Sequence, residues 1–143
     1  MASFSHTVAI PKPPGEVFPW LLEEDKVPQW TTRLQTYDVL GGGTIGHGTR
    51  IRQVLTVSGQ PLDIEMEIVR YDPPGFAESH FSTNGVKVET TYALRADGAG
   101  TELTQTLEGK ADGFKGRLLL PVVQPKLEAK IAEDLERLRA LLA

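Results

Sequence analysis

Apolar residues recur at every second position through most of the chain after Arg33, and this period lengthens only after Gly116. The clearest stretch is Leu62–Ile68, in which every second residue is apolar and the residues between them are acidic. Such alternation predicts strands with one buried face and one solvated face. A run of such strands followed by one helix predicts a sheet with the helix packed across it.

Turn signals divide the alternating region into strands. Asn84-Gly85 is the strongest short hairpin signal, and Asp72–Gly75 and Asp97–Gly100 contain residues that favour turns. Prolines 13 and 14 end the first strand, because proline donates no hydrogen bond to a sheet. The expected strands are Ser3–Ile10, Leu34–Leu40, Thr49–Val57, Leu62–Asp72, Phe76–Ser82, Val86–Leu94 and Thr101–Lys110.

Helices are expected in two places. Between the first two strands, Glu16–Leu22 has apolar pairs at helical spacing, and Val27–Trp30 is a second short helix or turn. Near the C-terminus, apolar residues spaced by three and four predict a long amphipathic helix from Lys126 to Leu141. Pro121 and Pro125 are expected to delay, kink or break its first turns. The fold class is therefore α+β: a curved antiparallel sheet of about seven strands gripped by a C-terminal helix, with residues 1–143 as one domain.

Composition excludes several classes of protein. The chain has no cysteine, which removes disulfides and thiolate chemistry. Its net charge of −4 disfavours a nucleic-acid surface. No signal peptide is expected, and no apolar run approaches the roughly 20 residues that span a bilayer. We therefore expect a cytoplasmic protein, monomeric or homodimeric, without a nucleic-acid partner or integral membrane association.

The inner face of the sheet follows from the alternation. Pairing across the turns sets Ile68 opposite Ser79, Phe81 opposite Val88, and Tyr92 opposite Gln105, and it sets Gln53 opposite Met66. A few polar residues then face inward: Gln53, Ser79, Thr90, Tyr92 and Gln105, with His6 as a further candidate. They either bond to each other, as in a Tyr92–Gln105 contact, or orient a ligand in an apolar pocket. The candidate ligand-binding residues are Gln53, Met66, Ile68, Ser79, Phe81, Val88, Thr90, Tyr92 and Gln105.

Nucleotide binding, metal binding and nucleophilic catalysis have little support in the sequence. Gly41–Gly46 matches a dinucleotide fingerprint, but a strand is expected next where that fingerprint needs a helix. The histidines lack metal-ligand spacing, so no metal or cofactor is expected. No nucleophile motif occurs, and Tyr92 is the first candidate for an acid or oxyanion donor. The polar face of the C-terminal helix carries both charge signs, which favours packing on the sheet over a membrane surface.

Several motifs together resemble the START-like (SRPBCC) helix-grip superfamily, in particular its polyketide cyclase/dehydratase-like group. They are Ile10 with Pro13, Pro14, Glu16, Val17 and Phe18; Trp30; Gly46-His47-Gly48-Thr49; and Asp97–Thr101 with Leu103 and Thr104. The resemblance implies a hydrophobic cavity between sheet and helix. It favours binding of a lipid, polyketide or quinone-like molecule without catalysis. The alternatives are a metal-free polyketide cyclase or dehydratase, and a protein-interaction module without a ligand.

Overall fold

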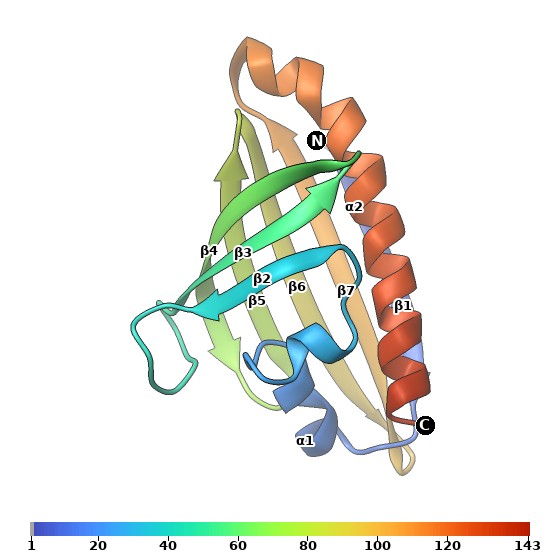
Figure 1. Ribbon diagram of the computed structural model, residues 1–143. Coiled ribbons are helices and arrows are strands. Elements are labelled where there is room, and N and C mark those ends of the chain that lie inside the picture. Colours follow the sequence, from blue (N-terminus) through green and yellow to red (C-terminus); the bar gives the residue numbers. More distant parts are fainter. Residues whose placement is uncertain (1) are drawn as a thin grey trace.

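The computed structural model describes residues 2–143 and contains one seven-stranded antiparallel sheet with a long helix across it, as the sequence predicts (Figure 1). The strands lie in the order β1-β7-β6-β5-β4-β3-β2. The elements in chain order are β1 (Ala2–Ile10), α1 (Pro14–Val17), η1 (Phe18–Trp20), η2 (Val27–Gln29), β2 (Leu34–Val39), β3 (Arg50–Val57), β4 (Gln60–Asp72), β5 (Phe76–Thr83), β6 (Val86–Asp97), β7 (Gly100–Ala111) and α2 (Gly113–Leu141).

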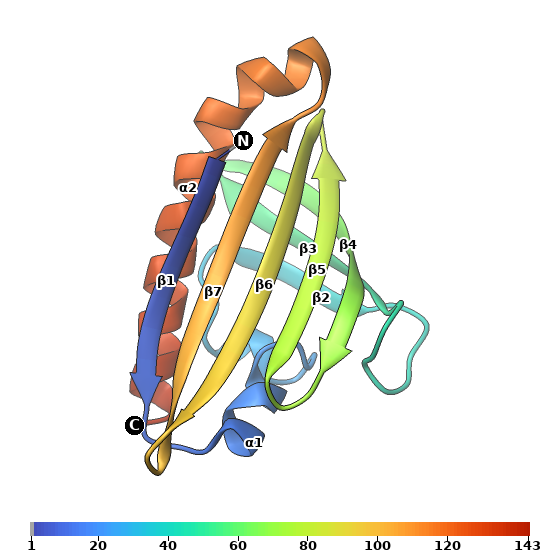
Figure 2. The ribbon, with the colours of Figure 1, turned by 180° about the vertical axis from the view of Figure 1, so that it is seen from behind.

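The sheet is strongly curved. Figure 1 shows β2 and β3 crossing in front of β5, β6 and β7, and Figure 2 shows the same crossing from behind. The helix α2 runs along the β1 and β7 side. The short helices α1, η1 and η2 close the end of the sheet near the C-terminus of α2. The core forms where these layers meet, and α2 contributes its buried residues Leu127, Ile131, Leu135 and Leu138.

The predicted register is confirmed around β5, β6 and β7. Ile68 pairs with Ser79, Phe81 with Val88, and Tyr92 with Gln105. The predicted pairing of Gln53 with Met66 is wrong by two residues. Gln53 lies opposite Ile64, while Met66 lies opposite Ile51.

The cause of this error is the turn between β3 and β4. Ser58 and Gly59 both have positive φ (53° and 78°), which makes a tight two-residue hairpin between Val57 and Gln60. The sequence interpretation used a longer turn that included Pro61. A shift of two residues leaves each side chain on its original face, so the assignment of inner and outer faces is unaffected.

The long helix differs from its prediction at its N-terminal end. It begins at Gly113, and Pro121 and Pro125 lie inside it. Figure 1 shows the ribbon changing direction in these first turns, as expected where prolines remove hydrogen bonds. The first turns of the helix pack closely on the β5–β6 turn. A Cβ on Gly116 would lie 1.9 Å from the carbonyl oxygen of Gly85 in that turn.

The predicted helix over Glu16–Leu22 is shorter and begins earlier. α1 starts at Pro14, where a first helical turn accepts proline, and the chain narrows into η1 at Phe18. Pro19 lies within η1 and cannot donate to an α-helical ladder. Within residues 2–143, no helix is long and apolar enough to cross a membrane.

Candidate functional site

A small cavity lies between the inner face of the sheet, α2 and the segment that carries η1 and η2. We call it the central cavity, and its volume is about 100 Å³. This is less than the roughly 300–1,000 Å³ of common ligand pockets. Its lining residues are Leu21, Leu22, Val27, Trp30, Thr31, Tyr37, Gln53, Leu55, Ile64, Met66, Ser79, Phe81, Thr90, Tyr92, Gln105, Leu107, Leu127, Lys130, Ile131 and Asp134.

Most of the candidate ligand-binding residues lie on this lining. They are Gln53, Met66, Ser79, Phe81, Thr90, Tyr92 and Gln105. Ile68 and Val88 do not line the cavity; both are fully buried in the core. Their inward orientation is as expected, but they lie beyond the open space.

Sequence reasoning missed the part of the lining that lies outside strands β3 to β7. Tyr37 comes from β2, and Leu127, Lys130, Ile131 and Asp134 come from α2. The helical spacing of Leu127 and Ile131 gives their buried face in the sequence. Asp134 follows Leu127 by seven residues and Ile131 by three, so the same spacing places it on the buried face, and only its charge argued against burial.

The polar side chains of the lining differ in whether another group of the protein forms a hydrogen bond with them. Gln53 Nε2 donates to Met66 Sδ at 3.4 Å. Within residues 2–143, the side chains of Ser79, Thr90, Tyr92 and Gln105 form no hydrogen bond. Gln124 Oε1 is the one unpaired side-chain atom of these residues that is also fully enclosed by protein, so the four unpaired side chains are not fully enclosed. These four groups therefore retain contact with open space in the cavity. Tyr92 and Gln105 lie opposite each other without a side-chain hydrogen bond.

Both tyrosines of the lining are held in the neutral form. Burial raises the pKa of Tyr92, and the Asp134 carboxylate raises it further. Burial is also the main cause that raises the pKa of Tyr37. The Tyr37 hydroxyl donates to the Leu22 carbonyl at 2.6 Å, so it is occupied, whereas the Tyr92 hydroxyl remains available as a donor.

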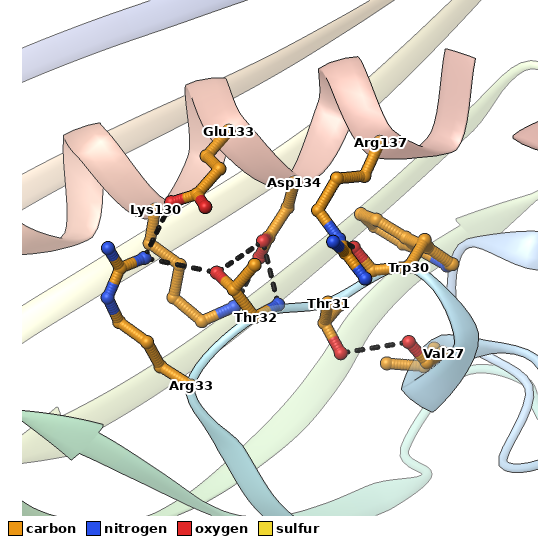
Figure 3. Close-up of polar contacts among 9 residues, drawn as sticks. All are labelled: Val27, Trp30, Thr31, Thr32, Arg33, Lys130, Glu133, Asp134 and Arg137. Carbon is orange, nitrogen blue, oxygen red and sulfur yellow. Dashed lines mark hydrogen bonds and ion pairs between the residues drawn. The ribbon is translucent and has the colours of Figure 1, made fainter. Parts of the chain in front are cut away.

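A polar cluster joins α2 to the segment between η2 and β2 (Figure 3). Asp134 is buried and accepts from the Thr32 amide at 2.8 Å, the Thr32 hydroxyl at 2.7 Å, and the Lys130 ammonium. Arg137 Nε donates to the Trp30 carbonyl at 3.1 Å. The ionic groups of the central cavity, Lys130 and Asp134, are thus paired with each other, and the lining offers a ligand no unpaired charge.

A larger cleft of about 610 Å³ opens on the surface beside the central cavity. We call it the side cleft; it separates α2 from the β3–β4 turn. Its lining residues are Arg33, Thr56, Val57, Ser58, Gly59, Pro125, Lys126, Leu127, Ala129 and Lys130. Leu127 and Lys130 line both spaces, so these two side chains form the wall between the side cleft and the central cavity.

The remaining candidates lie elsewhere. His6 does not line the central cavity; its Nε2 lies 3.0 Å from Glu136 on α2, and this contact lowers the pKa of Glu136. The glycine loop over residues 41–48 lines a separate surface hollow and is followed by strand β3. His80, on the outer sheet face, lies 2.6 Å from Glu78, and Glu89 is also near it. An imidazole–carboxylate hydrogen bond accounts for this group.

Comparisons with solved structures agree with the observed architecture. A protein from Thermus thermophilus, TTHA0849, superposes with a TM-score of 0.80 at 19% identity, covering 99% of this chain and 97% of that one. A START superfamily protein from Mycobacterium smegmatis gives 0.74 at 16% identity, covering 99% of both chains. The di-domain ARO/CYC protein BexL gives 0.67 at 20% identity, covering 95% of this chain and 47% of that one. These likenesses show the shared fold.

No curated protein matches the chain in sequence. A family model described as "Polyketide cyclase / dehydrase and lipid transport" matches residues 1–143. The match agrees with the START-like resemblance of the sequence motifs and with the helix-grip fold. The chain therefore belongs to the polyketide cyclase / dehydrase and lipid transport family.

Proposed function

We propose that this protein binds a hydrophobic or amphipathic small molecule in the central cavity, beneath α2. The observation that carries the proposal is the set of unpaired neutral polar groups in a mostly apolar lining, with Tyr92 and Gln105 as the main donors. Ligand pockets combine apolar walls with a few such orienting groups. In a filled core, by contrast, buried polar groups pair with each other.

The charge balance of the lining narrows the ligand class. Lys130 and Asp134 neutralise each other, and both tyrosines are neutral at pH 7, as tyrosines ordinarily are, with pKa values that burial raises further. A free carboxylate would lose its hydration without gaining an unpaired cation, which is unfavourable. The proposed ligand is therefore a neutral molecule with a carbonyl or hydroxyl oxygen, such as a quinone or a neutral polyketide.

The cavity must enlarge to hold such a ligand, since its volume of about 100 Å³ is below that of common ligand pockets. The side cleft supports a route for this change. Its wall is formed by Leu127 and Lys130, two flexible side chains on α2 beside Pro125. Because Pro125 removes a helical hydrogen bond at this point, we expect α2 to yield there when a ligand enters.

Native mass spectrometry tests the proposal with two probes, the quinone menadione and decanoic acid. We expect a retained one-to-one complex with menadione and a much weaker one with decanoic acid. Thr90 and Thr91 provide a matched pair of variants, because they are adjacent on β6 and Thr90 lines the cavity while Thr91 does not. Thr90→Val should weaken the menadione complex and Thr91→Val should leave it intact. Absence of any complex at micromolar concentration would overturn the proposal.

A second candidate is a polyketide cyclase or dehydratase. The observation that favours it is the Tyr92 hydroxyl, whose raised pKa keeps it protonated and available to donate a hydrogen bond to the developing oxyanion of a bound carbonyl. The similarity to the ARO/CYC protein BexL supports the same class. Tyr92→Phe would then abolish turnover of a polyketide-like substrate without lowering the melting temperature. Unchanged turnover would exclude Tyr92 from the mechanism.

The cytoplasmic location stays a prediction.

A further inference from the structure

The first half of α2 exposes an apolar stripe to solvent. Phe114, Leu118 and Val122 follow one another at four-residue spacing, so they lie along one face of the helix. Their exposed fractions are 76%, 61% and 54%. The opposite face carries Gly116 and Gln124, which are buried against the rest of the fold. The stripe therefore points away from the molecule and has no partner within residues 2–143.

The charges beside this stripe have a single sign. Lys115, Arg117 and Lys126 are exposed, and residues 113–127 include no aspartate or glutamate. None of these three cations forms an ion pair within residues 2–143. At helical spacing, Arg117 lies on one side of the stripe, and Lys115 and Lys126 lie on the other. The whole chain has a net charge of −4; residues 113–127 carry +3 and the other residues together carry −7.

We propose that this basic–apolar face, formed by Phe114, Lys115, Arg117, Leu118, Val122 and Lys126, docks on an anionic phospholipid surface. Apolar side chains that enter the headgroup region, flanked by unpaired cations, are the features of a helix that lies in a membrane interface. Charge complementarity favours this occupant over a symmetric dimer through the same face, because two copies of the face would bring like charges together.

The two halves of α2 differ in charge and in packing. The predicted helix Lys126–Leu141 carries both charge signs and packs on the sheet. The turns from Gly113 to Pro125, which the structure adds, carry only basic charge, and their residues Phe114, Leu118 and Val122 point outward. Leu119, Leu120 and Val123 on the other side of these turns pack against the core. The two halves of α2 thus have different roles: the second half closes the central cavity, and the first half presents the docking face.

The docking face adjoins the side cleft. Lys126 belongs to both, and the next residue, Leu127, forms the wall to the central cavity. A docked molecule would therefore hold the side cleft close to the lipid headgroups, where a hydrophobic ligand dissolved in the bilayer could enter. This route rests on the proposed ligand-binding function, whereas the docking itself does not.

Co-sedimentation with vesicles tests docking without any ligand. We expect the protein to bind vesicles of phosphatidylcholine with phosphatidylglycerol, to bind phosphatidylcholine alone much less, and to lose affinity as salt rises. Each basic residue near an anionic surface contributes about fivefold in affinity. The triple variant Lys115→Gln, Arg117→Gln, Lys126→Gln should therefore lose on the order of 100-fold. Phe114→Ser with Leu118→Ser should lose at least about tenfold through the apolar contacts.

The matched control is Arg50→Gln, Arg52→Gln, Arg95→Gln, which removes the same charge from the outer face of the sheet. It should retain vesicle binding. Equal binding of both triple variants would overturn the proposal. A second result would also overturn it: the wild type binds no vesicles and sediments as a dimer, and Phe114→Ser with Leu118→Ser converts that dimer to a monomer. Menadione binding by the triple Gln variant is measured separately, so a failure of docking is distinguished from a failure of ligand binding.

Discussion

Asp134 on α2 accepts hydrogen bonds from both the backbone amide and the hydroxyl of Thr32, at 2.8 and 2.7 Å, and so joins the helix to the segment that follows η2 (Figure 3). The carboxylate is buried and also pairs with Lys130. Because Thr31, Lys130 and Asp134 line the central cavity, this contact closes the cavity on the side opposite the inner sheet.

Loss of the Thr32 hydroxyl should destabilise the fold. Thr32→Val leaves Asp134 with one donor fewer, and a hydrogen bond to a charged group is worth about 1.5–3 kcal/mol. We expect the free energy of unfolding to fall by that amount in urea. The control is Glu133→Ala, which removes an exposed ion pair with Arg33 (2.9 Å) worth about 0–1 kcal/mol. Equal losses in the two variants would contradict the assigned importance of Asp134.

Tyr92→Phe should weaken ligand binding without affecting folding. The hydroxyl has no hydrogen-bond partner among residues 2–143, so its removal leaves no unpaired group behind. A lost neutral hydrogen bond of about 0.5–1.5 kcal/mol predicts a two- to tenfold rise in the Kd for menadione. Isothermal titration calorimetry measures the Kd, and thermal unfolding checks that Tm is unchanged. A lower Tm with the same Kd would mean that the hydroxyl serves the fold instead of the ligand.

The buried tyrosines predict alkaline destabilisation. The pKa values of Tyr37 and Tyr92 are raised in the folded protein, mainly by burial. Above about pH 10, tyrosines of the unfolded chain ionise while these two stay protonated. Their stabilising contribution is complete below that pH and is lost as pH rises towards their folded values. Each should lower the unfolding free energy by about 1.4 kcal/mol per pH unit in this window.

Denaturation in urea from pH 9 to 12 tests this slope, with Tyr37→Phe and Tyr92→Phe for comparison. Each variant should show a shallower decline than the wild type, since lysine and arginine titration is common to all three. Absorbance at 295 nm should reveal little phenolate from these residues before unfolding. Identical slopes in all three proteins would contradict the neutral, buried state of the tyrosines.

A methyl group at Gly116 should disturb the start of α2. The added Cβ would lie 1.9 Å from the Gly85 carbonyl oxygen, which is backbone and yields little. Overpacking of this kind costs about 1–3 kcal/mol, so Gly116→Ala should lower Tm by several degrees. Gly15→Ala is the control, because within residues 2–143 no atom beyond its chain neighbours and its own helix backbone lies within 4 Å of the added Cβ. A Tm for Gly116→Ala that matches Gly15→Ala would show that the first turns of α2 pack less closely than described.

The sequence determined most of the sheet, because alternation reports directly which side chains are buried. The register through Tyr92 and Gln105 follows from turn chemistry alone. The β3–β4 pairing was wrong because Ser58 adopts positive φ beside Gly59, a conformation that composition does not force. The start of α2 was missed because internal prolines usually end helices, and the packing of Gly116 on Gly85 is a tertiary contact without a local signal.

The candidate site was predictable to the same extent. Residues such as Ser79 and Thr90 follow from strand parity and lie on the lining of the central cavity. The burial of Asp134 was missed because an acidic residue is usually solvated, although its spacing from Leu127 and Ile131 places it on the buried face of the helix. Its place depends on the Thr32 donors, which come from more than 100 residues away in the chain. Small cavity volume is likewise a result of side-chain packing that periodicity does not describe.

The most direct test of ligand binding beneath α2 is an NMR titration of protein labelled at the methionine methyl groups. The chain has two methionines, Met1 and Met66, and Met66 lines the central cavity. Met66→Leu identifies its signal. Menadione should shift the Met66 methyl resonance in a saturable way. A Met66 signal that stays constant while mass spectrometry detects bound menadione would place the ligand elsewhere and contradict the account.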